Sequence, residues 1–256
     1  MSYTNPSEIT QMAVMAGVRK ATQPVRKQVL LGFAAGAFIA LGFMLAIKVS
    51  AGVPAAWGGM NNFIGALVFP LGLILCLAAG GELLTGNMMA VPIAWYAGKI
   101  NLRQWSVNWA VITIGNMAGA IFVAYVFGHL AGITEHGEEL ARTVALASAK
   151  LDEPFHAAFI SGIGCNWLVS LAVWMSYGAK DGTGFAMSVW FPTMAFVALG
   201  FQHVVANMFL VPAAIFAGEA SWSAFLGNFV PVFLGNAVGG GLFVGGLYAA
   251  VYLKHQ

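Results

Sequence analysis

Two stretches of the sequence decide the fold. They are NMMAVPIAWYAG, which begins at Asn87, and NMFLVPAAIFAG, which begins at Asn207. Asn, Met, Pro and Gly recur in both at a constant offset of 120 residues. The same offset continues downstream without a gap, and it pairs Asn108 with Asn228, Gly115-Asn116 with Gly235-Asn236, and Gly119 with Gly239. A match of this length predicts an internal repeat. The glycine pairs, spaced by four, are typical of closely packed helices.

The composition places this repeat in a membrane. Of the 256 residues 60% are hydrophobic and 8% are charged, whereas a soluble domain carries about 25% charged residues. This excludes a cytosolic enzyme, a nucleic-acid-binding protein and a secreted disulfide scaffold. Cys76 and Cys165 lie in apolar runs and are expected to be small buried hydrophobes. No metal or other cofactor is expected, and residues 1–26 are too polar for a cleavable signal.

Six apolar blocks predict six transmembrane helices, since about 20 helical residues cross a bilayer core. They are Val29–Ala51, Asn62–Ala97, Trp105–Leu130, Phe155–Tyr177, Gly184–Ala217 and Trp222–Leu253. With both termini cytoplasmic, three basic residues lie outside: Lys48, Arg142 and Lys150. The others lie inside: Arg19, Lys20, Arg26, Lys27, Lys99, Arg103, Lys180 and Lys254. This positive-inside bias predicts a multi-pass protein of the cell inner (plasma) membrane with both termini cytoplasmic.

The second and fifth blocks are too long for one crossing, at about 36 and 34 residues against about 20 needed. Each has a weak point near its middle, AAGGELLTGN at residues 78–87 and ALGFQHVVAN at residues 198–207. We therefore expect each block to form two half-helices joined by a non-helical loop. Such a loop is stable at membrane depth only where it is buried in protein or lines a cavity. The alternative is one long tilted helix with a glycine kink.

An odd number of spans in each repeat makes the second copy enter the membrane from the opposite side. The expected organisation is a single transport domain over residues 1–256. It comprises an N-terminal segment (1–27), repeat one (about 28–131), an outer loop (about 132–154) containing a short interfacial helix at 137–150, and repeat two (about 155–253). Paired broken helices in inverted repeats indicate a transport pathway. Asn87 and Asn207 are expected to cap the half-helices that begin there.

Polar side chains within membrane spans are costly and indicate function. Glu82 and His203 lie at the two breaks, and the repeat offset places them one residue out of register. An imidazole at the midplane can donate a hydrogen bond or a proton to an anion. The alternative is a neutral histidine that bridges backbone groups at the break. A carboxylate would repel an anion, so Glu82 is expected to accept backbone N–H bonds from its own loop and to maintain the loop's shape.

Taken together, these motifs resemble the formate/nitrite transporter family over nearly the whole chain. The resemblance is carried by NPSEI at 5–9, FPLGLILCLAAGGELLTGN at 69–87, GIGCNWLVSLAVW at 162–174 and GFQHVVANMFLVP at 200–212. It implies an aquaporin-like protomer of six transmembrane helices, an all-α membrane protein whose second and fifth helices are broken. It also implies a homopentamer with a pore in each protomer, and small monovalent anions, chiefly formate, and protons as partners.

The resemblance further implies roles for individual residues. Thr85 resembles the family's loop threonine, His203 its central histidine, and Asn166 and Asn207 its pore asparagines. Lys150 resembles the lysine of the outer vestibule. The residues that resemble its hydrophobic constrictions are Phe69, Leu73, Leu83 and Phe196. With Glu82 and Asn87 assigned to loop structure, these residues form the expected pathway, in which a weak acid enters as an anion and is neutralised near His203.

The chain departs from the family pattern at Ser161, Ser170, Gln202 and Leu84. These departures leave the fold in place but weaken the assignment of the anion, so nitrite and hydrosulfide remain alternatives to formate. A channel for neutral solutes of the aquaporin type is a further alternative, although neither break contains Asn-Pro-Ala. An intramembrane enzyme is not expected, because His203 is the only histidine deep inside a span, the others lying in loops or at span edges, and because Ser161 lacks a protease context.

Overall fold

The computed structural model describes residues 3–253, so Lys254 lies outside the described residues. The chain between these limits is helical, with one isolated bridge between Tyr3 and Ala179. In order, its elements are α1 (Pro6–Thr22), α2 (Val25–Ser50), η1 (Ala55–Trp57), α3 (Met60–Val68), α4 (Leu71–Leu75), η2 (Cys76–Gly80), α5 (Leu84–Tyr96), α6 (Leu102–Val123), η3 (Ala124–Leu130), α7 (Gly137–Leu151), α8 (Phe155–Gly178), α9 (Gly182–Ala198), α10 (Val204–Phe216), α11 (Trp222–Val238), η4 (Gly239–Gly246) and α12 (Leu247–Tyr252).

These elements make the six expected membrane crossings. Five helical stretches are each long and apolar enough to cross a bilayer: Val25–Ser50, Met60–Gly80, Leu102–Leu130, Phe155–Gly178 and Trp222–Tyr252. The fifth crossing is shared by two shorter apolar helices, α9 and α10. Helix α5 completes the second crossing, just as α10 completes the fifth. The chain is therefore an all-α, multi-pass membrane protein built from two inverted repeats.

Both long crossings are broken, as the sequence predicted. Residues 81–83 and 201–203 are not helical. Each break follows a glycine with a positive φ angle, 92° at Gly80 and 73° at Gly200, a conformation that glycine adopts without steric cost. The next backbone N–H turns back onto the preceding helix, from Gly81 to the Cys76 carbonyl at 2.7 Å and from Phe201 to the Phe196 carbonyl at 3.1 Å. A single kinked helix is thereby excluded.

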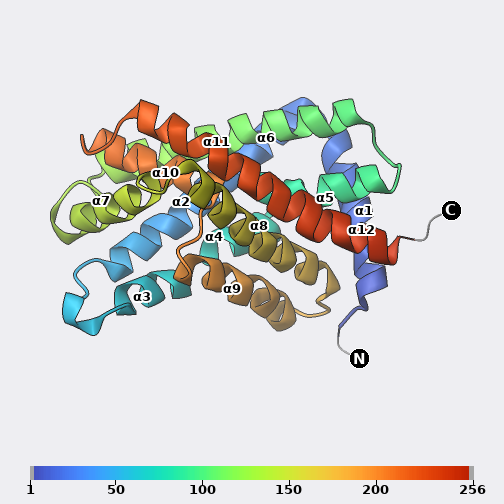
Figure 1. Ribbon diagram of the computed structural model, residues 1–256, viewed down its shortest axis with the longest axis horizontal. Coiled ribbons are helices and arrows are strands. Elements are labelled where there is room, and N and C mark those ends of the chain that lie inside the picture. Colours follow the sequence, from blue (N-terminus) through green and yellow to red (C-terminus); the bar gives the residue numbers. More distant parts are fainter. Residues whose placement is uncertain (1–2, 254–256) are drawn as a thin grey trace.

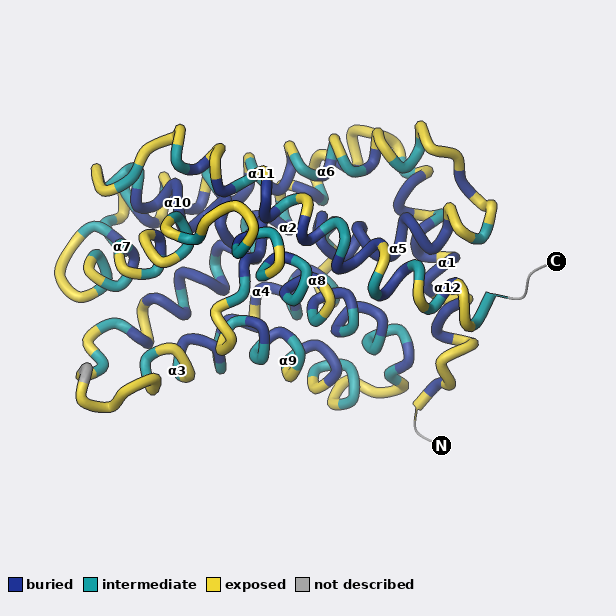
Figure 2. The backbone as a smooth tube through the Cα atoms, viewed as in Figure 1, coloured by how far each residue is buried: buried dark blue, intermediate teal, exposed yellow. Residues whose placement is uncertain are grey.

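The half-helices after the breaks form the centre of the molecule. Helices α5 and α10 are buried along residues 84–94 and 204–214 (Figure 2). Glycines let the surrounding helices approach closely, as the spacing predicted. A Cβ atom on Gly119 of α6 would lie 1.9 Å from the Phe33 carbonyl oxygen of α2, and one on Gly239 would lie 2.3 Å from that of Ile163 in α8. Side chains do not fit at either position.

The two ends of the molecule carry different short helices. Helices α1 and α12 lie at one end, and α7 lies at the other (Figure 1). Helix α7 confirms the short helix expected at residues 137–150. It packs on α10 as α1 packs on α5. These helices extend the repeat at an offset of 130, which relates Lys20 to Lys150 and the N-caps of α2 and α8, Pro24 and Pro154.

Candidate transport pathway

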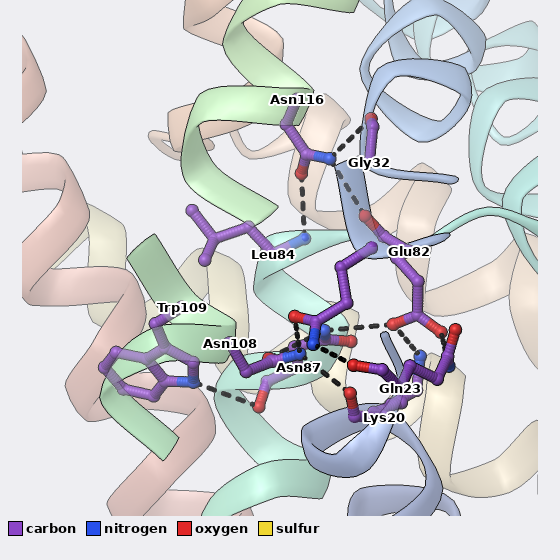
Figure 3. Close-up of polar contacts among 10 residues, drawn as sticks. Lys20, Gln23, Gly32, Glu82, Leu84, Asn87, Asn108, Trp109 and Asn116 are labelled. Carbon is purple, nitrogen blue, oxygen red and sulfur yellow. Dashed lines mark hydrogen bonds and ion pairs between the residues drawn. The ribbon is translucent and has the colours of Figure 1, made fainter. Parts of the chain in front are cut away.

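Two asparagines hold the starts of the half-helices in place. The Asn116 side chain accepts the first backbone N–H of α5, from Leu84 at 2.8 Å, and donates to the carbonyls of Glu82 and Gly32. Asn236 repeats this arrangement for α10: it accepts from Val204 at 2.9 Å and donates to the carbonyls of Gln202 and Gly162. Figure 3 shows the first of these sites. Each asparagine thus satisfies one backbone donor and two acceptors that water does not reach.

The prediction that Asn87 and Asn207 cap these helices is wrong. The N-cap positions are Leu83 and His203, and the asparagines lie one turn further on. The Asn87 amide donates to Glu82 and Asn108, both at 3.0 Å. The Asn207 amide donates in the same way to Gln202 at 2.7 Å and Asn228 at 2.8 Å. A hydrogen-bonding side chain therefore holds each break from inside its own half-helix, and Figure 3 shows the first of the two, Asn87.

Glu82 is braced differently from the expectation. The offset of 120 relates Glu82 to Gln202, and it relates Leu83 to His203. Glu82 is therefore a carboxylate at a place where the second break has an amide. The Glu82 carboxylate accepts hydrogen bonds from the side chains of Lys20 at 2.9 Å, Gln23 at 3.1 Å and Asn87. These bonds take the place of the expected backbone N–H bonds from its own loop. The Lys20–Glu82 ion pair is buried and joins α1 to the first break. A buried carboxylate is stable here because a cation and two amides share its charge.

His203 joins the two breaks. Its Nδ1 atom accepts the backbone N–H of Ala206 at 3.0 Å, and its Nε2 atom lies 2.9 Å from Thr85 Oγ1. A backbone N–H only donates, so Nδ1 carries no proton and the neutral ring holds its proton on Nε2. The ring then donates to the Thr85 hydroxyl, whose own proton is free to point at a ligand. His203 is both a helix cap and half of a donor pair.

Apolar side chains surround His203, whereas Thr85 lines neither of the two cavities described below. The rings of Phe69 and Phe196 meet edge to face at 5.6 Å, and Phe196 stacks on the His203 ring at 5.5 Å. With Leu73 and Leu83 they line a void too narrow for a water molecule. All four apolar side chains are buried. The structure thus gathers the four expected constriction residues around His203.

A wider cavity of about 330 Å³ leads from the α7 end to Phe69, Phe196 and His203. Lys150 and Asn207 are on its wall, whereas Leu73 and Leu83 are not among its lining residues. We call this cavity the vestibule. The Lys150 ammonium donates to the carbonyls of Gly200 at 2.5 Å and Phe201 at 2.9 Å. Burial lowers the pKa of Lys150. The lysine therefore binds the backbone of the second break from the open side.

Asn166 lies behind Thr85 instead of on the vestibule wall. Its amide donates to the Thr85 carbonyl at 3.2 Å and the Asn236 carbonyl at 2.7 Å, and its oxygen accepts from Ser170. Ser161, at a position where the family pattern differs, accepts the Gln202 backbone N–H at 3.1 Å. These contacts fix the backbones of both breaks, so Asn166 bears on the pathway through the position of Thr85.

Sequence reasoning missed several polar residues of this region. The sequence places Lys20 and Gln23 in a terminal segment, and it identifies Asn116, Asn228 and Asn236 only as members of the repeat. A usable signal existed, because asparagines recur inside apolar spans at the repeat offset. Arg142 also lines the vestibule, and it had been counted only as an outer-side charge.

Comparison with known proteins agrees with this architecture. The family described as formate/nitrite transporter matches residues 7–250, and the chain belongs to that family. It is 53% identical over 254 residues to an uncharacterized transporter, YrhG, of Bacillus subtilis (strain 168), covering 99% of this chain and 96% of the relative. It is 51% identical to the formate channel BtFdhC of Bacillus thuringiensis over 100% of this chain and 98% of the relative.

A solved structure resembles most of the chain. It is described as a pentameric formate channel with formate bound, has a TM-score of 0.79 and is 35% identical to this chain. The alignment covers 90% of this chain and 98% of the solved one. The protein is therefore a membrane protein of a transporter family.

Proposed function

We propose that this chain is a formate channel without enzymatic activity, which assembles as a homopentamer in the plasma membrane. Both termini are then cytoplasmic, and α7 and the vestibule face outward. The likeness to a full-length formate channel and to a pentameric channel with bound formate supports the substrate and the assembly. The charge distribution of the loops supports the orientation. The observation that carries the proposal is the Thr85–His203 donor pair between apolar side chains.

The pathway begins with attraction of the anion. Lys150 places a positive charge in the vestibule, and the N-termini of α5 and α10 both point toward the breaks. Backbone N–H groups at a helix start favour anions. A formate ion that reaches Phe196 meets the Thr85 hydroxyl, which is polarised by the Nε2–H of His203. That hydroxyl donates one hydrogen bond to the carboxylate.

The apolar void then selects the neutral acid. Moving a bare ion into an apolar passage costs many kcal/mol. Protonating a carboxylate of ordinary pKa at neutral pH costs on the order of 4–5 kcal/mol, at 1.36 kcal/mol per pKa unit. The proton joins the carboxylate in the vestibule, formic acid crosses between Leu73 and Leu83, and the proton leaves on the far side. The step conserves charge and is electroneutral.

The hydrogen bonds of His203 bear on where the proton comes from. Donating the Nε2 proton outright would leave an imidazolate, and accepting a second proton on Nδ1 would break the Ala206 cap. Bulk water in the vestibule is therefore the proton source, and His203 and Thr85 serve as fixed donors that orient the acid. This differs from a scheme in which a protonated histidine lends the proton.

A flux panel in proteoliposomes tests the proposal. Formate, nitrite, hydrosulfide and water are compared at external pH 7 and 6. Formate is expected to permeate fastest, and its flux to rise about tenfold per pH unit while the concentration of the neutral acid limits transport. Faster nitrite or hydrosulfide flux would reassign the substrate within the family. Rapid water flux without anion flux would favour the aquaporin-type alternative.

A further inference from the structure

The outer wall of the vestibule contains a second cation, Arg142, whose charge no described residue neutralises. Its Nε atom donates to Ser50 Oγ at 3.1 Å, and its Nη2 atom donates to Asn62 Oδ1 at 2.8 Å. Both acceptors are neutral. Within residues 3–253, no ion pair includes Arg142. The nearby Glu139 is paired with Lys48, so it is not the counter-ion of this guanidinium.

The guanidinium is held at a place where its charge matters. Arg142 is half-buried, and burial lowers its pKa, although an arginine stays protonated at any physiological pH. Two of its five N–H groups are used in these bonds, which leaves three that can donate to another partner. A half-buried charge without a counter-ion on a cavity wall is costly unless an anion visits it.

Arg142 and Lys150 line the same cavity. They lie eight residues apart on α7, so about 12 Å of helix separates their positions along the axis. Lys150 also contacts only neutral carbonyl oxygens. One carboxylate, Glu153, is on the wall as well and lies close enough to Lys150 to affect its charge. Basic side chains therefore outnumber acidic ones on the vestibule wall, two against one.

The repeat indicates that Arg142 is not needed to build its helix. The offset that relates Lys150 to Lys20 relates Arg142 to Met12 of α1, which is an exposed apolar residue. At the α1 end, the Lys20 charge is also neutralised by Glu82. Among the described residues, Arg142 and Lys150 therefore have no ion-pair partner, whereas the equivalent places of α1 hold Met12 and the paired Lys20.

We propose that Arg142 and Lys150 form an anion-binding site in the vestibule that takes small monocarboxylates before they reach the Phe69–Phe196 constriction. The inference rests on the proposed function for the substrate. The planar guanidinium matches a carboxylate with two parallel hydrogen bonds, and Lys150 receives the anion next. Because the site lies before the constriction, it also binds carboxylates that are too bulky to permeate, such as benzoate.

Two variants separate this binding role from a merely structural link between α7, α2 and α3. Arg142→Met introduces the residue found at the equivalent place in α1. Asn62→Asp keeps the hydrogen bond to Arg142 and adds a carboxylate that forms an ion pair with the guanidinium. The double variant Lys48→Met, Glu139→Gln is the matched control, since it removes an ion pair at the same end that does not line the vestibule and leaves no freed carboxylate beside Arg142.

The first measurement is initial formate uptake by intact cells, in which all protomers have one orientation. Both variants are expected to raise the apparent KM about three- to tenfold, as for the loss of one partly screened charged hydrogen bond. Maximal flux should stay within twofold, and the control should match the wild type. Benzoate should compete with formate in the wild type and less in both variants. A structural link alone predicts an unchanged KM for Asn62→Asp, which would overturn the proposal.

The second measurement is calorimetric titration of the purified protein with sodium formate and sodium benzoate, which needs no transport. Weaker binding by both variants than by the wild type supports the site even if formate does not permeate, in which case only the proposed function fails. Transport of formate by the wild type, together with unchanged binding in both variants, retains the proposed function and rejects this site. If Arg142→Met does not fold, Asn62→Asp decides.

Discussion

The hydroxyl of Thr85 is the smallest group on which the proposed mechanism depends. Thr85→Val preserves the shape of a buried side chain and removes one donor. A hydrogen bond to a charged group contributes about 1.5–3 kcal/mol, so formate flux at low concentration should fall about 10- to 100-fold. The control is Thr113→Val, because the Thr113 hydroxyl bonds only to the Trp109 carbonyl one turn back in α6. Equal flux in both variants would show that the hydroxyl does not contact the substrate.

His203 has two functions that substitution can separate. Asparagine is a good N-cap, so His203→Asn should keep the bond to the Ala206 N–H and lose the one to Thr85. His203→Phe loses both. We expect the asparagine variant to unfold near the wild-type temperature in detergent while transporting poorly, and the phenylalanine variant to be less stable as well. Wild-type transport by His203→Phe, with an unchanged pH profile, would make the histidine purely structural.

Among elements, α1 depends on one buried ion pair. Removing one partner of such a pair costs on the order of 3–5 kcal/mol, because the other charge stays buried. Lys20→Met should therefore destabilise the protein strongly, as measured by thermal unfolding in detergent.

The related break suggests how to restore stability. There the amide of Gln202 occupies the place of the Glu82 carboxylate and accepts from Asn207. The double variant Lys20→Met, Glu82→Gln should thus recover most of the lost stability. If the double variant is no more stable than Lys20→Met, the cost lies in the packing of α1 and not in its charge.

The helices also show which parts of the structure the sequence can predict. The breaks were predictable because glycines and polar residues interrupt blocks too long for one crossing. The equivalence of α1 and α7 was not predictable from the sequence. The two helices share only a lysine and a following proline, which are too few matches to align them. The contacts of Asn116 and Asn236 with the half-helix starts join residues 32 positions apart. Spacing alone identifies such asparagines as a pair but does not reveal which backbone group each one meets.

At the scale of the whole molecule, two inverted repeats share one backbone plan and differ in charge. The α7 end holds the vestibule with Lys150 and Arg142, and the α1 end holds the Lys20–Glu82 pair. Anion capture should consequently be stronger from the α7 side. A passive channel has the same ratio of maximal flux to KM in both directions at equal pH, so stronger capture should appear as a lower KM for formate that enters from that side. This KM should also be the more sensitive to salt, since the attraction is screened over about 8 Å at physiological ionic strength.

The direction of this asymmetry in a cell depends on topology. Cysteines introduced at Gly137, the first residue of α7, and at Tyr252, near the end of α12, should react with an impermeant thiol reagent from opposite sides of the membrane. Both native cysteines are buried, so they should contribute little background. With α7 outside, the Gly137→Cys variant is labelled in intact cells and the Tyr252→Cys variant only after lysis. The reverse pattern would place the vestibule in the cytoplasm and give formate export the lower KM, whereas labelling of both from one side would contradict six crossings.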